Sequence, residues 1–358
     1  MIRAQSAVEA LSPYLLADPG PPGALSLAQN ESAFPPSPHA LVAAQSALTT
    51  QSLYPDPDWS DLRKAISEVL GLDPLKILCG AGSMELIGCL VKAFAGPGEE
   101  VLGSAYGYLF VKTAAAQAGA RYRSAPESNF TVSPEALLEA VMPHTKVLFL
   151  CNPGNPTGTR IANSEIVRLR ERLSPNVLLV VDQAYGEFDG QDPSPIFDLV
   201  GRGDTVVLRT FSKAYGLAGA RVGWGLFPEE IAASVRKLLN PNNVSSCSQA
   251  MAAAALRDQD HMLGLVRKTE IIRDEALRRL RGAGYPVPQS HTNFLLVPFE
   301  TPERAAEADE LLRRESFILR GVGGYGLPRC LRATVVEEVA MRRVADIICA
   351  LQEGGNAK

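Results

Sequence analysis

The stretch "TVVLRTFSKAYGLAGARVGW" (residues 205–224) begins as a β-strand and ends as a turn rich in small residues. Val and Leu dominate its first half, as is typical of a strand covered on both faces. Lys213 follows that strand, with the hydroxyls of Thr210 and Ser212 before it and a run of small residues after it. The stretch therefore predicts a lysine at the end of a buried strand, where the backbone can approach a ligand closely.

Two further runs, "KVLFLC" (146–151) and "NVLLVV" (176–181), share this apolar character and alternate with segments of helical periodicity. One such segment, "VSPEALLEAV", offers Ser133 as an N-cap and Pro134 in the first turn. Strands and helices that alternate at this spacing predict an α/β fold, with a mostly parallel central sheet and helices on both faces.

The pattern changes after residue 255. A charged helical stretch over 257–282 is followed by the strand-like "NFLLVPF", a helix over 302–314 and a final amphipathic helix. This order predicts a smaller α+β C-terminal domain. We expect three parts: an N-terminal arm with part of the small domain (1–44), a large cofactor-binding domain (45–255) and the small domain (256–358).

The composition excludes several classes of function. The chain has 358 residues, a net charge of −4 and 46% hydrophobic residues, and this balance gives no reason to expect a nucleic-acid or membrane partner. No apolar run approaches the roughly 18 residues that cross a bilayer, and the start lacks the apolar core of a signal peptide. The six cysteines and four histidines match no ligand spacing, so we expect no metal and a cytoplasmic location.

Each of the three apolar runs is followed by polar side chains. Asn155 lies in "NPGNPTG", Asp182 and Tyr185 lie in "DQAY", and Lys213 lies in "FSK". Any one of these motifs is ordinary turn chemistry. Because ligands of open α/β sheets bind at the carboxyl ends of the strands, the three together indicate a site.

The chemistry of this set points to one cofactor. A partly desolvated lysine such as Lys213 forms a Schiff base with an aldehyde. The hydroxyls of Thr210 and Ser212 and the guanidinium of Arg221 suit a phosphate. An aldehyde and a phosphate on one molecule describe pyridoxal 5′-phosphate, whose pyridine nitrogen needs a carboxylate such as Asp182.

Two smaller predictions follow for the same cofactor. Tyr185 and Asn155 offer hydrogen-bond donors to its ring oxygen. A glycine-bearing turn at Ala81, Gly82 and Ser83 opens a helix, whose free N–H groups favour an anion such as the phosphate.

The motifs "SKAYGLAGARVGW", "NPGNPTG" and "DQAYGEF" together resemble the fold-type I pyridoxal-phosphate aminotransferases of class I/II, with their aspartate-aminotransferase-like large domain. The nearest subgroup is the histidinol-phosphate aminotransferase-like enzymes. Matches such as "LAQNESAFPPSP" (27–38), "GAGSMELI" (80–87) and "CLRATV" (330–335) extend the resemblance over nearly the whole chain.

The resemblance implies further roles. Lys213 would bind the cofactor and then move the substrate Cα proton, with glutamate as the expected donor. Tyr106 would stack on the pyridine ring, and Tyr54 would reach the partner's cofactor phosphate in a homodimer. Arg332 would bind the substrate carboxylate. The arm residues Asn30 and Tyr14 and the later Arg320 would complete the substrate cleft, although Tyr54 and Tyr106 also suit plain packing and Arg320 also suits a hinge.

At several positions, the chain departs from the sequence pattern of the subgroup that it resembles. Ala81 and Met84 replace an amide and an acid, Gln183 replaces an acid, and Asn242 replaces a tyrosine. These changes leave an aromatic amino acid aminotransferase and a threonine-phosphate-decarboxylase-like enzyme open as alternatives. A non-enzymatic cofactor-binding protein is a further alternative, which no feature of the sequence favours.

Overall fold

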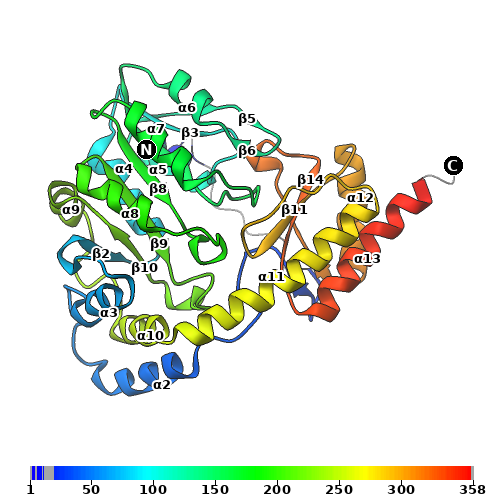
Figure 1. Ribbon diagram of the computed structural model, residues 1–358, viewed down its shortest axis with the longest axis horizontal. Coiled ribbons are helices and arrows are strands. Elements are labelled where there is room, and N and C mark those ends of the chain that lie inside the picture. The colour runs from blue at the N-terminus through cyan, green and yellow to red at the C-terminus, as the bar shows by residue number, and fades with distance from the viewer. Residues whose placement is uncertain (1, 5, 10, 12–19, 356–358) are drawn as a thin grey trace.

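The run that opens the quoted stretch forms β9 (Thr205–Thr210), an inner strand of a seven-stranded sheet. The structure, a computed structural model, describes residues 2–4, 6–9, 11 and 20–355 (Figure 1). The strand order is β2-β10-β9-β8-β7-β3-β4, and β10 alone among these seven runs antiparallel to its neighbours. The predicted mostly parallel sheet is confirmed. Its other strands are β2 (Ile77–Gly80), β3 (Glu100–Ser104), β4 (Arg121–Ala125), β7 (Thr145–Cys151), β8 (Leu178–Asp182) and β10 (Gly223–Leu226).

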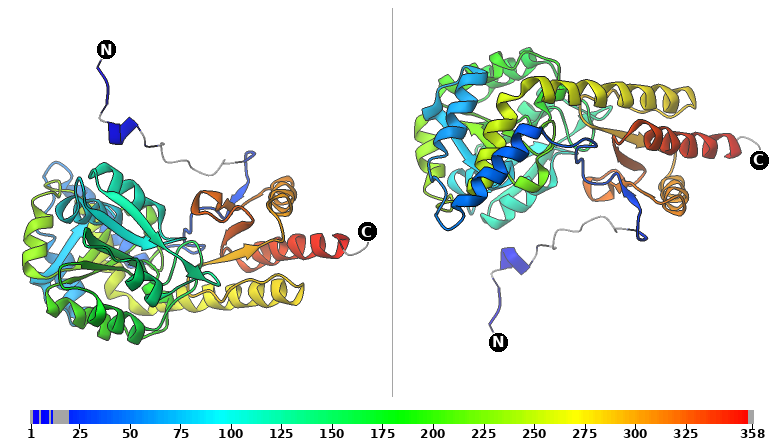
Figure 2. Two further views of the ribbon diagram at one scale, coloured as in Figure 1. Left: turned by 90° about the horizontal axis from the view of Figure 1, so that it is seen from above. Right: turned by 90° about the horizontal axis from the view of Figure 1, so that it is seen from below.

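Helices cover both faces of this sheet, as the sequence predicts (Figures 1 and 2). They are α2 (Pro38–Ala47), α3 (Ser60–Leu70), α4 (Ser83–Phe94), α5 (Leu109–Gln117), α6 (Pro134–Ala140), α7 (Asn163–Arg172), α8 (Ser194–Asp198), α9 (Glu229–Arg236) and α10 (Ser246–Arg257). Short elements connect them: α1 (Ser6–Glu9), β5 (Glu127–Ser128), β6 (Thr131–Val132), η1 (Leu48–Thr50), η2 (Pro74–Lys76), η3 (Gly186–Phe188), η4 (Leu199–Arg202) and η5 (Ala218–Ala220).

Local sequence signals set several helix ends. The Ser133 hydroxyl accepts a hydrogen bond from the Ala136 N–H, and Pro134 is the first residue of α6. At the end of α3, Gly71 takes a left-handed conformation with φ of 69°, which a residue without Cβ adopts at little cost. The Ser133 cap and Pro134 act where the sequence predicts them.

The C-terminal part builds a second, smaller core. Its three-stranded antiparallel sheet has the order β11-β14-β13 and packs against long helices. Its elements are α11 (Gln259–Gly282), β11 (Phe294–Pro298), α12 (Pro302–Arg314), β12 (Phe317–Ile318), β13 (Arg320–Gly321), η6 (Gly323–Tyr325), β14 (Cys330–Thr334) and α13 (Glu338–Gly355).

Two segments tie the parts of the chain together. The helix α11 contributes Met262 and Val266 to the large core and Leu277 and Leu280 to the small one. The arm strand β1 (Leu25–Ser26) pairs in parallel with β12 of the small part. The division at residues 44 and 255 stays a prediction, because these segments serve both cores.

Candidate active site

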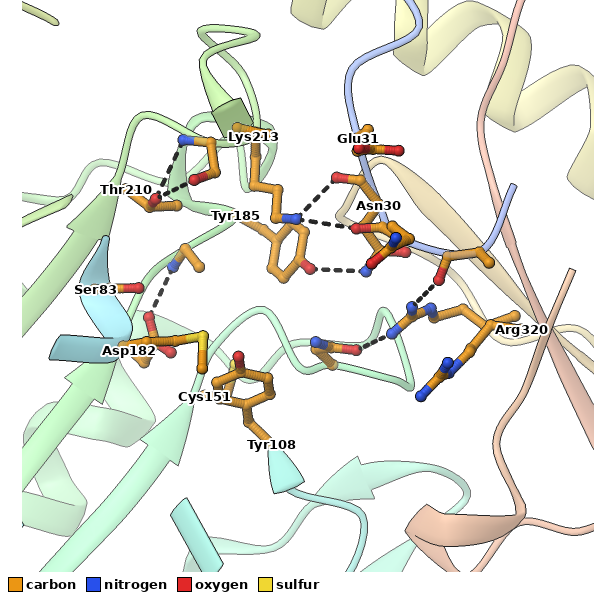
Figure 3. Close-up of a pocket in the computed structure, with 18 of the residues that line it drawn as sticks. Asn30, Glu31, Ser83, Tyr108, Cys151, Asp182, Tyr185, Thr210, Lys213 and Arg320 are labelled. Carbon is orange, nitrogen blue, oxygen red and sulfur yellow. Dashed lines mark hydrogen bonds between the residues drawn. The ribbon is translucent and has the colours of Figure 1, made fainter. Parts of the chain in front are cut away.

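A cavity of about 350 Å³ lies where β7, β8 and β9 end (Figure 3). The carboxyl ends of parallel strands meet at one edge of a sheet, so their polar end residues converge there. Eleven residues that the sequence analysis singles out line this cavity: Asn30, Ser83, Asn155, Asp182, Tyr185, Thr210, Ser212, Lys213, Arg221, Arg320 and Arg332.

Lys213 extends from the loop after β9 toward the arm (Figure 3). Its Nζ donates to the carbonyl oxygens of Asn30 at 2.9 Å and Gln29 at 3.3 Å. Burial, and then the positive charge of Arg332, lower the pKa of Lys213 to about 7. A lysine in this state is half deprotonated near neutral pH and can act as a nucleophile or a base.

Asp182 is the last residue of β8 and is only 3% exposed. Its Oδ1 accepts a hydrogen bond from the Ala184 N–H at 3.1 Å. Burial raises the pKa of Asp182 to about 7, although the Lys213 charge opposes this rise. A buried carboxylate of this kind is stabilised in its ionised form by a protonated nitrogen placed beside it.

Tyr185 and Asn30 join the strand edge to the arm. The Tyr185 hydroxyl accepts a hydrogen bond from Asn30 Nδ2 at 2.8 Å, and its ring meets Phe294 edge-on with centroids 5.3 Å apart. Burial raises the pKa of Tyr185, so its hydroxyl stays protonated and can donate. Asn30 takes a left-handed backbone with φ of 55°, and its N–H donates to Thr334 Oγ1 at 2.9 Å.

Asn293, which the sequence analysis missed, holds the same arm from the small part. Its Nδ2 donates to the carbonyl oxygens of Asn30 and Glu31, both at 3.1 Å. The Asn30 carbonyl thus accepts from both Lys213 and Asn293. In sequence, "HTNF" looks like an ordinary loop before a strand, so no signal marks Asn293 as part of the site.

The expected phosphate cradle is built from two turns. Thr210 Oγ1 donates to Ser212 Oγ at 3.0 Å, and Arg221 Nη1 donates to the same oxygen at 3.4 Å. A Cβ on Gly82 would lie 2.5 Å from Arg221 Nη2, so this position requires glycine. Ser83, the first residue of α4, faces the cavity at the helix N-terminus, which favours an anion.

Ala81 and Gly82 are not among the residues that line the cavity. The Ala81 N–H donates instead to Glu85 Oε2 at 2.7 Å, which also accepts from Asn243 Nδ2 at 2.6 Å. The contact of Ala81 with a ligand stays a prediction: Glu85 holds its turn, and Ser83 faces the cavity. Gly82 lies against the Arg221 guanidinium and, without a Cβ, leaves room for it.

Arg320 and Arg332 are direct cross-strand partners in β13 and β14. Arg332 donates from Nη1 to Asn155 Oδ1 at 2.6 Å and from Nη2 to the Ala28 carbonyl at 2.7 Å, while its buried Nε has no hydrogen-bond partner. Like charges placed opposite one another destabilise a strand pair. An anionic ligand between the two arginines would offset that cost.

Of the two neighbouring tyrosines Tyr106 and Tyr108, Tyr108 lines the cavity and the expected Tyr106 does not (Figure 3). Tyr106 points elsewhere: its ring lies 6.2 Å from that of Phe130, and its N–H donates to Glu127 Oε1 at 3.1 Å. The motif "SAYGYLF" offers both tyrosines within three residues. Tyr108 directly precedes α5, and its place at this helix N-terminus brings it to the cavity.

The other substitutions noted in the sequence fall in different places. Met84 lines the cavity, whereas Asn242 does not. Gln183 is buried, and its Oε1 accepts from Arg209 Nε at 3.2 Å and Nη2 at 3.0 Å. Arg209 also pairs with Glu187 at 3.1 Å. Gln183 therefore serves a buried network that sequence reasoning missed, and it does not face a substrate.

Tyr54 is a further predicted residue that does not line this cavity. Tyr54 is 88% exposed on the surface of the subunit. Tyr14 lies outside the described residues, so its role stays a prediction. Elsewhere in the described chain, we find no group of three or more His, Cys, Asp or Glu side chains placed to hold a metal ion. No helix within the described ranges is both long and apolar enough to span a membrane.

The donor set fits pyridoxal phosphate. It combines a lysine with a lowered pKa, a buried carboxylate with a raised pKa, and a hydroxyl–guanidinium cradle in which Gly82 leaves room for Arg221. A family model, "Aminotransferase class I and II", matches residues 22–348. The chain belongs to the class I and II aminotransferases. It is therefore a transaminase that depends on pyridoxal phosphate.

Known members of this aminotransferase family include close relatives of the chain. It is 41% identical over 335 residues to the histidinol-phosphate aminotransferase of Hyphomonas neptunium, covering 92% of this chain and 91% of that protein. It is 44% identical over 315 residues to that of Paramagnetospirillum magneticum, covering 87% of each.

A solved structure confirms the aspartate-aminotransferase-like fold of this aminotransferase. The crystal structure of histidinol-phosphate aminotransferase from Sinorhizobium meliloti, in complex with pyridoxal-5′-phosphate, superposes with a TM-score of 0.91 at 29% identity. The match covers 99% of this chain and 98% of that one.

Proposed function

We propose that this aminotransferase interconverts glutamate and the keto counterpart of histidinol phosphate with 2-oxoglutarate and histidinol phosphate. The observation that carries the proposal is the Arg320–Arg332 pair, whose two residues are cross-strand partners and both line the cavity. Such a pair suits a phosphate better than a neutral side chain. The names of the relatives at 41% and 44% identity support the same substrate.

Several residues would hold the cofactor, which, when bound, carries the amino group from donor to acceptor. Asp182 would keep the pyridine nitrogen protonated, and Tyr185 would donate to the ring oxygen. Asn155 uses its Oδ1 to accept from Arg332, so its NH₂ group is the part that would donate to the same ring oxygen. Tyr108 would stack on the ring, in place of Tyr106.

The phosphate of the cofactor would lie between the two turns that meet at Arg221. Thr210, Ser212 and Arg221 supply side-chain donors there, and Ser83 supplies the start of α4. An anion is stabilised by such a helix N-terminus and by a guanidinium fork.

Lys213 would bind the cofactor covalently and then move the proton at the substrate Cα. A pKa of about 7 suits both tasks, because a base works best when its pKa lies near the working pH. The carbonyl oxygens of Gln29 and Asn30 accept from the amine in this structure, which keeps it at the cavity wall.

Arg332 would bind the carboxylate of glutamate through a bidentate pair. Histidinol phosphate has no carboxylate, so its phosphate would occupy the same anionic end with the help of Arg320. Asn30 and, by the family resemblance, Tyr14 would line the rest of the substrate cleft.

An aromatic amino acid is the second candidate substrate. Met84, Tyr108 and Tyr325 line the cavity and give part of it an apolar wall. Phenylalanine would place its carboxylate on Arg332 and its ring against this wall.

We also propose a cytoplasmic homodimer with shared sites. Tyr54 is exposed together with the apolar side chains of Leu53, Leu48 and Val42, which are 61% to 69% exposed. Exposed apolar surface of this kind marks an interface. In the dimer, Tyr54 would reach the partner's cofactor phosphate.

A half-reaction with product analysis tests the reaction and the substrate class. Enzyme loaded with pyridoxal phosphate is mixed with histidinol phosphate without a keto acid. We expect pyridoxamine phosphate and the keto product in equal amounts, and no pyridoxamine phosphate when the substrate is omitted. A parallel sample with phosphothreonine tests the decarboxylase alternative, because release of carbon dioxide without pyridoxamine phosphate would contradict transamination.

A further inference from the structure

An apolar cluster beside the cavity joins the large part of the chain to the small part. The large part contributes two aromatic residues, and the small part contributes β11, β14 and the loop between β13 and β14. The members are Tyr106 and Phe130 from the first, and Leu296, Val322, Tyr325, Leu327 and Cys330 from the second. Leu296, Val322 and Cys330 are at most 1% exposed, and the partly buried rings of Tyr106 and Phe130 pack against this small core.

Phe130 enters this cluster from the tip of a hairpin. Strands β5 and β6 are joined by the two residues Asn129 and Phe130, whose φ angles are 48° and 62°. Two positive φ values define a type I′ turn, which usually takes Asn or Gly. A phenylalanine in this region is strained, and such strain persists where the surrounding contacts compensate for it.

Neighbouring contacts fix the hairpin in place. Thr159 Oγ1, from the loop after β7, donates to the Phe130 carbonyl at 2.6 Å. At the base of the hairpin, Oε1 of the half-buried Glu127 accepts from the Tyr106 N–H at 3.1 Å, and the Tyr106 and Phe130 rings lie 6.2 Å apart. The hairpin and the Tyr106 turn therefore form one unit of the large part.

This unit packs against the loop that carries the substrate-binding side chains. Val322 follows Arg320 by two residues, and its carbonyl accepts from the N–H groups of Tyr325 at 3.0 Å and Leu327 at 3.3 Å. Arg320 and Tyr325 line the cavity, while Val322 and Leu327 pack in the cluster. Movement of the cluster would therefore move Arg320 and Tyr325.

We propose that Phe130 is a positioning residue that seats the Arg320–Tyr325 segment at the anionic end of the substrate. The inference rests on the proposed function in one respect, since it assigns that end to a phosphate. Phe130 itself does not line the cavity, so it acts through Val322, Tyr325 and Leu327.

The test compares three variants of the cofactor-loaded enzyme. Phe130→Ala removes the ring, Phe130→Leu keeps an apolar side chain without the flat ring, and Asn129→Gly is the matched control, which relaxes the same turn and keeps the ring. For each variant, the half-reactions with histidinol phosphate and with glutamate are followed as single turnovers, with KM as the half-saturating substrate concentration and kcat as the limiting rate. The Kd for inorganic phosphate is measured by calorimetry.

We expect Phe130→Ala to raise the KM for histidinol phosphate and the Kd for phosphate by about tenfold, equivalent to roughly 1.4 kcal/mol. The kcat with glutamate and the absorbance spectrum of the bound cofactor stay unchanged, because Lys213 and Asp182 lie across the cavity from Arg320 (Figure 3) and are not part of the cluster. Phe130→Leu shifts both constants in the same direction by a smaller factor, and it carries the test if Phe130→Ala does not fold. Asn129→Gly leaves both constants at their wild-type values.

Equal losses in both half-reactions would overturn the proposal, because they would assign Phe130 to general stability. An unchanged phosphate Kd in both Phe130 variants would overturn it as well. If the wild-type enzyme does not transaminate histidinol phosphate, the proposed function fails, and the phosphate Kd of the variants alone decides the role of Phe130.

Discussion

Asp182→Asn should stabilise the cofactor-free protein while it damages the enzyme. The substitution keeps the size of the side chain and an oxygen that can accept from the Ala184 N–H, which donates to Oδ1 at 3.1 Å. It removes a negative charge from a position that is 3% exposed. In the proposed role, the carboxylate serves the cofactor at a cost in stability, as is common at functional sites.

The pKa of the buried carboxyl gives the size of this cost. Burial raises the pKa of Asp182 from 3.8 to about 7. The folded protein then binds more protons than the unfolded chain between these pH values, so the free energy of unfolding falls as the pH rises through this window. At about 1.4 kcal/mol for each pKa unit, the loss approaches roughly 4 kcal/mol above pH 7 and vanishes near pH 4.

Urea unfolding of the cofactor-free proteins, at one protein concentration and over a range of pH, measures the effect. The difference in the free energy of unfolding between Asp182→Asn and wild type should be small at about pH 4 and should grow to roughly 4 kcal/mol in favour of the variant at about pH 8. Groups that do not interact with Asp182 cancel in this difference, whereas Lys213, whose charge lowers the pKa of Asp182, contributes to it. A difference that does not change with pH would refute the reasoning.

The same variant should behave oppositely as a holoenzyme. Without the carboxylate, the pyridine nitrogen loses the partner that keeps it protonated, and the rate should fall by at least roughly a hundredfold. Near-normal turnover would mean that Asp182 has another role.

The remaining predictions concern the other groups of the site. Arg332→Lys should lower kcat/KM for glutamate by roughly ten- to a hundredfold, since a hydrogen bond to a charged group is worth about 1.5–3 kcal/mol; an unchanged value would remove Arg332 from the substrate. Tyr108→Ala should shift the absorbance maximum of the bound cofactor and Tyr106→Ala should not, and a shift in the second alone would restore the original assignment. Mixing inactive Tyr54→Ala and Lys213→Ala subunits should restore part of the activity, because one site of the mixed dimer has both groups; no recovery after proven subunit exchange would contradict a shared site.

The sheet and its edge could be predicted because their signals are local. The apolar runs before Asn155, Asp182 and Lys213 are continuous, and each is followed at once by a polar motif. The structure places all three residues in one cavity because parallel strands end at the same edge of the sheet. Helix caps such as Ser133 were equally accessible, since the capping hydrogen bond spans only three residues.

Other features of the site could not be predicted, because they depend on turn geometry and on contacts between distant segments. Tyr106 and Tyr108 are two residues apart, and only the turn before α5 decides which of them faces the cavity. Asn293 binds the arm across 263 residues of sequence. The pairing of Arg320 with Arg332 depends on the register of two strands, which no local pattern specifies.

The central claim is that the two opposed arginines select a phosphorylated substrate. The most direct test is the ratio of kcat/KM for histidinol phosphate to that for phenylalanine, both measured with 2-oxoglutarate as the acceptor. The Arg320–Arg332 pair predicts that histidinol phosphate is preferred. It also predicts that Arg320→Ala lowers kcat/KM for histidinol phosphate by a larger factor than kcat/KM for phenylalanine. A preference for phenylalanine of more than about tenfold, or roughly 1.4 kcal/mol, would contradict the account of the substrate.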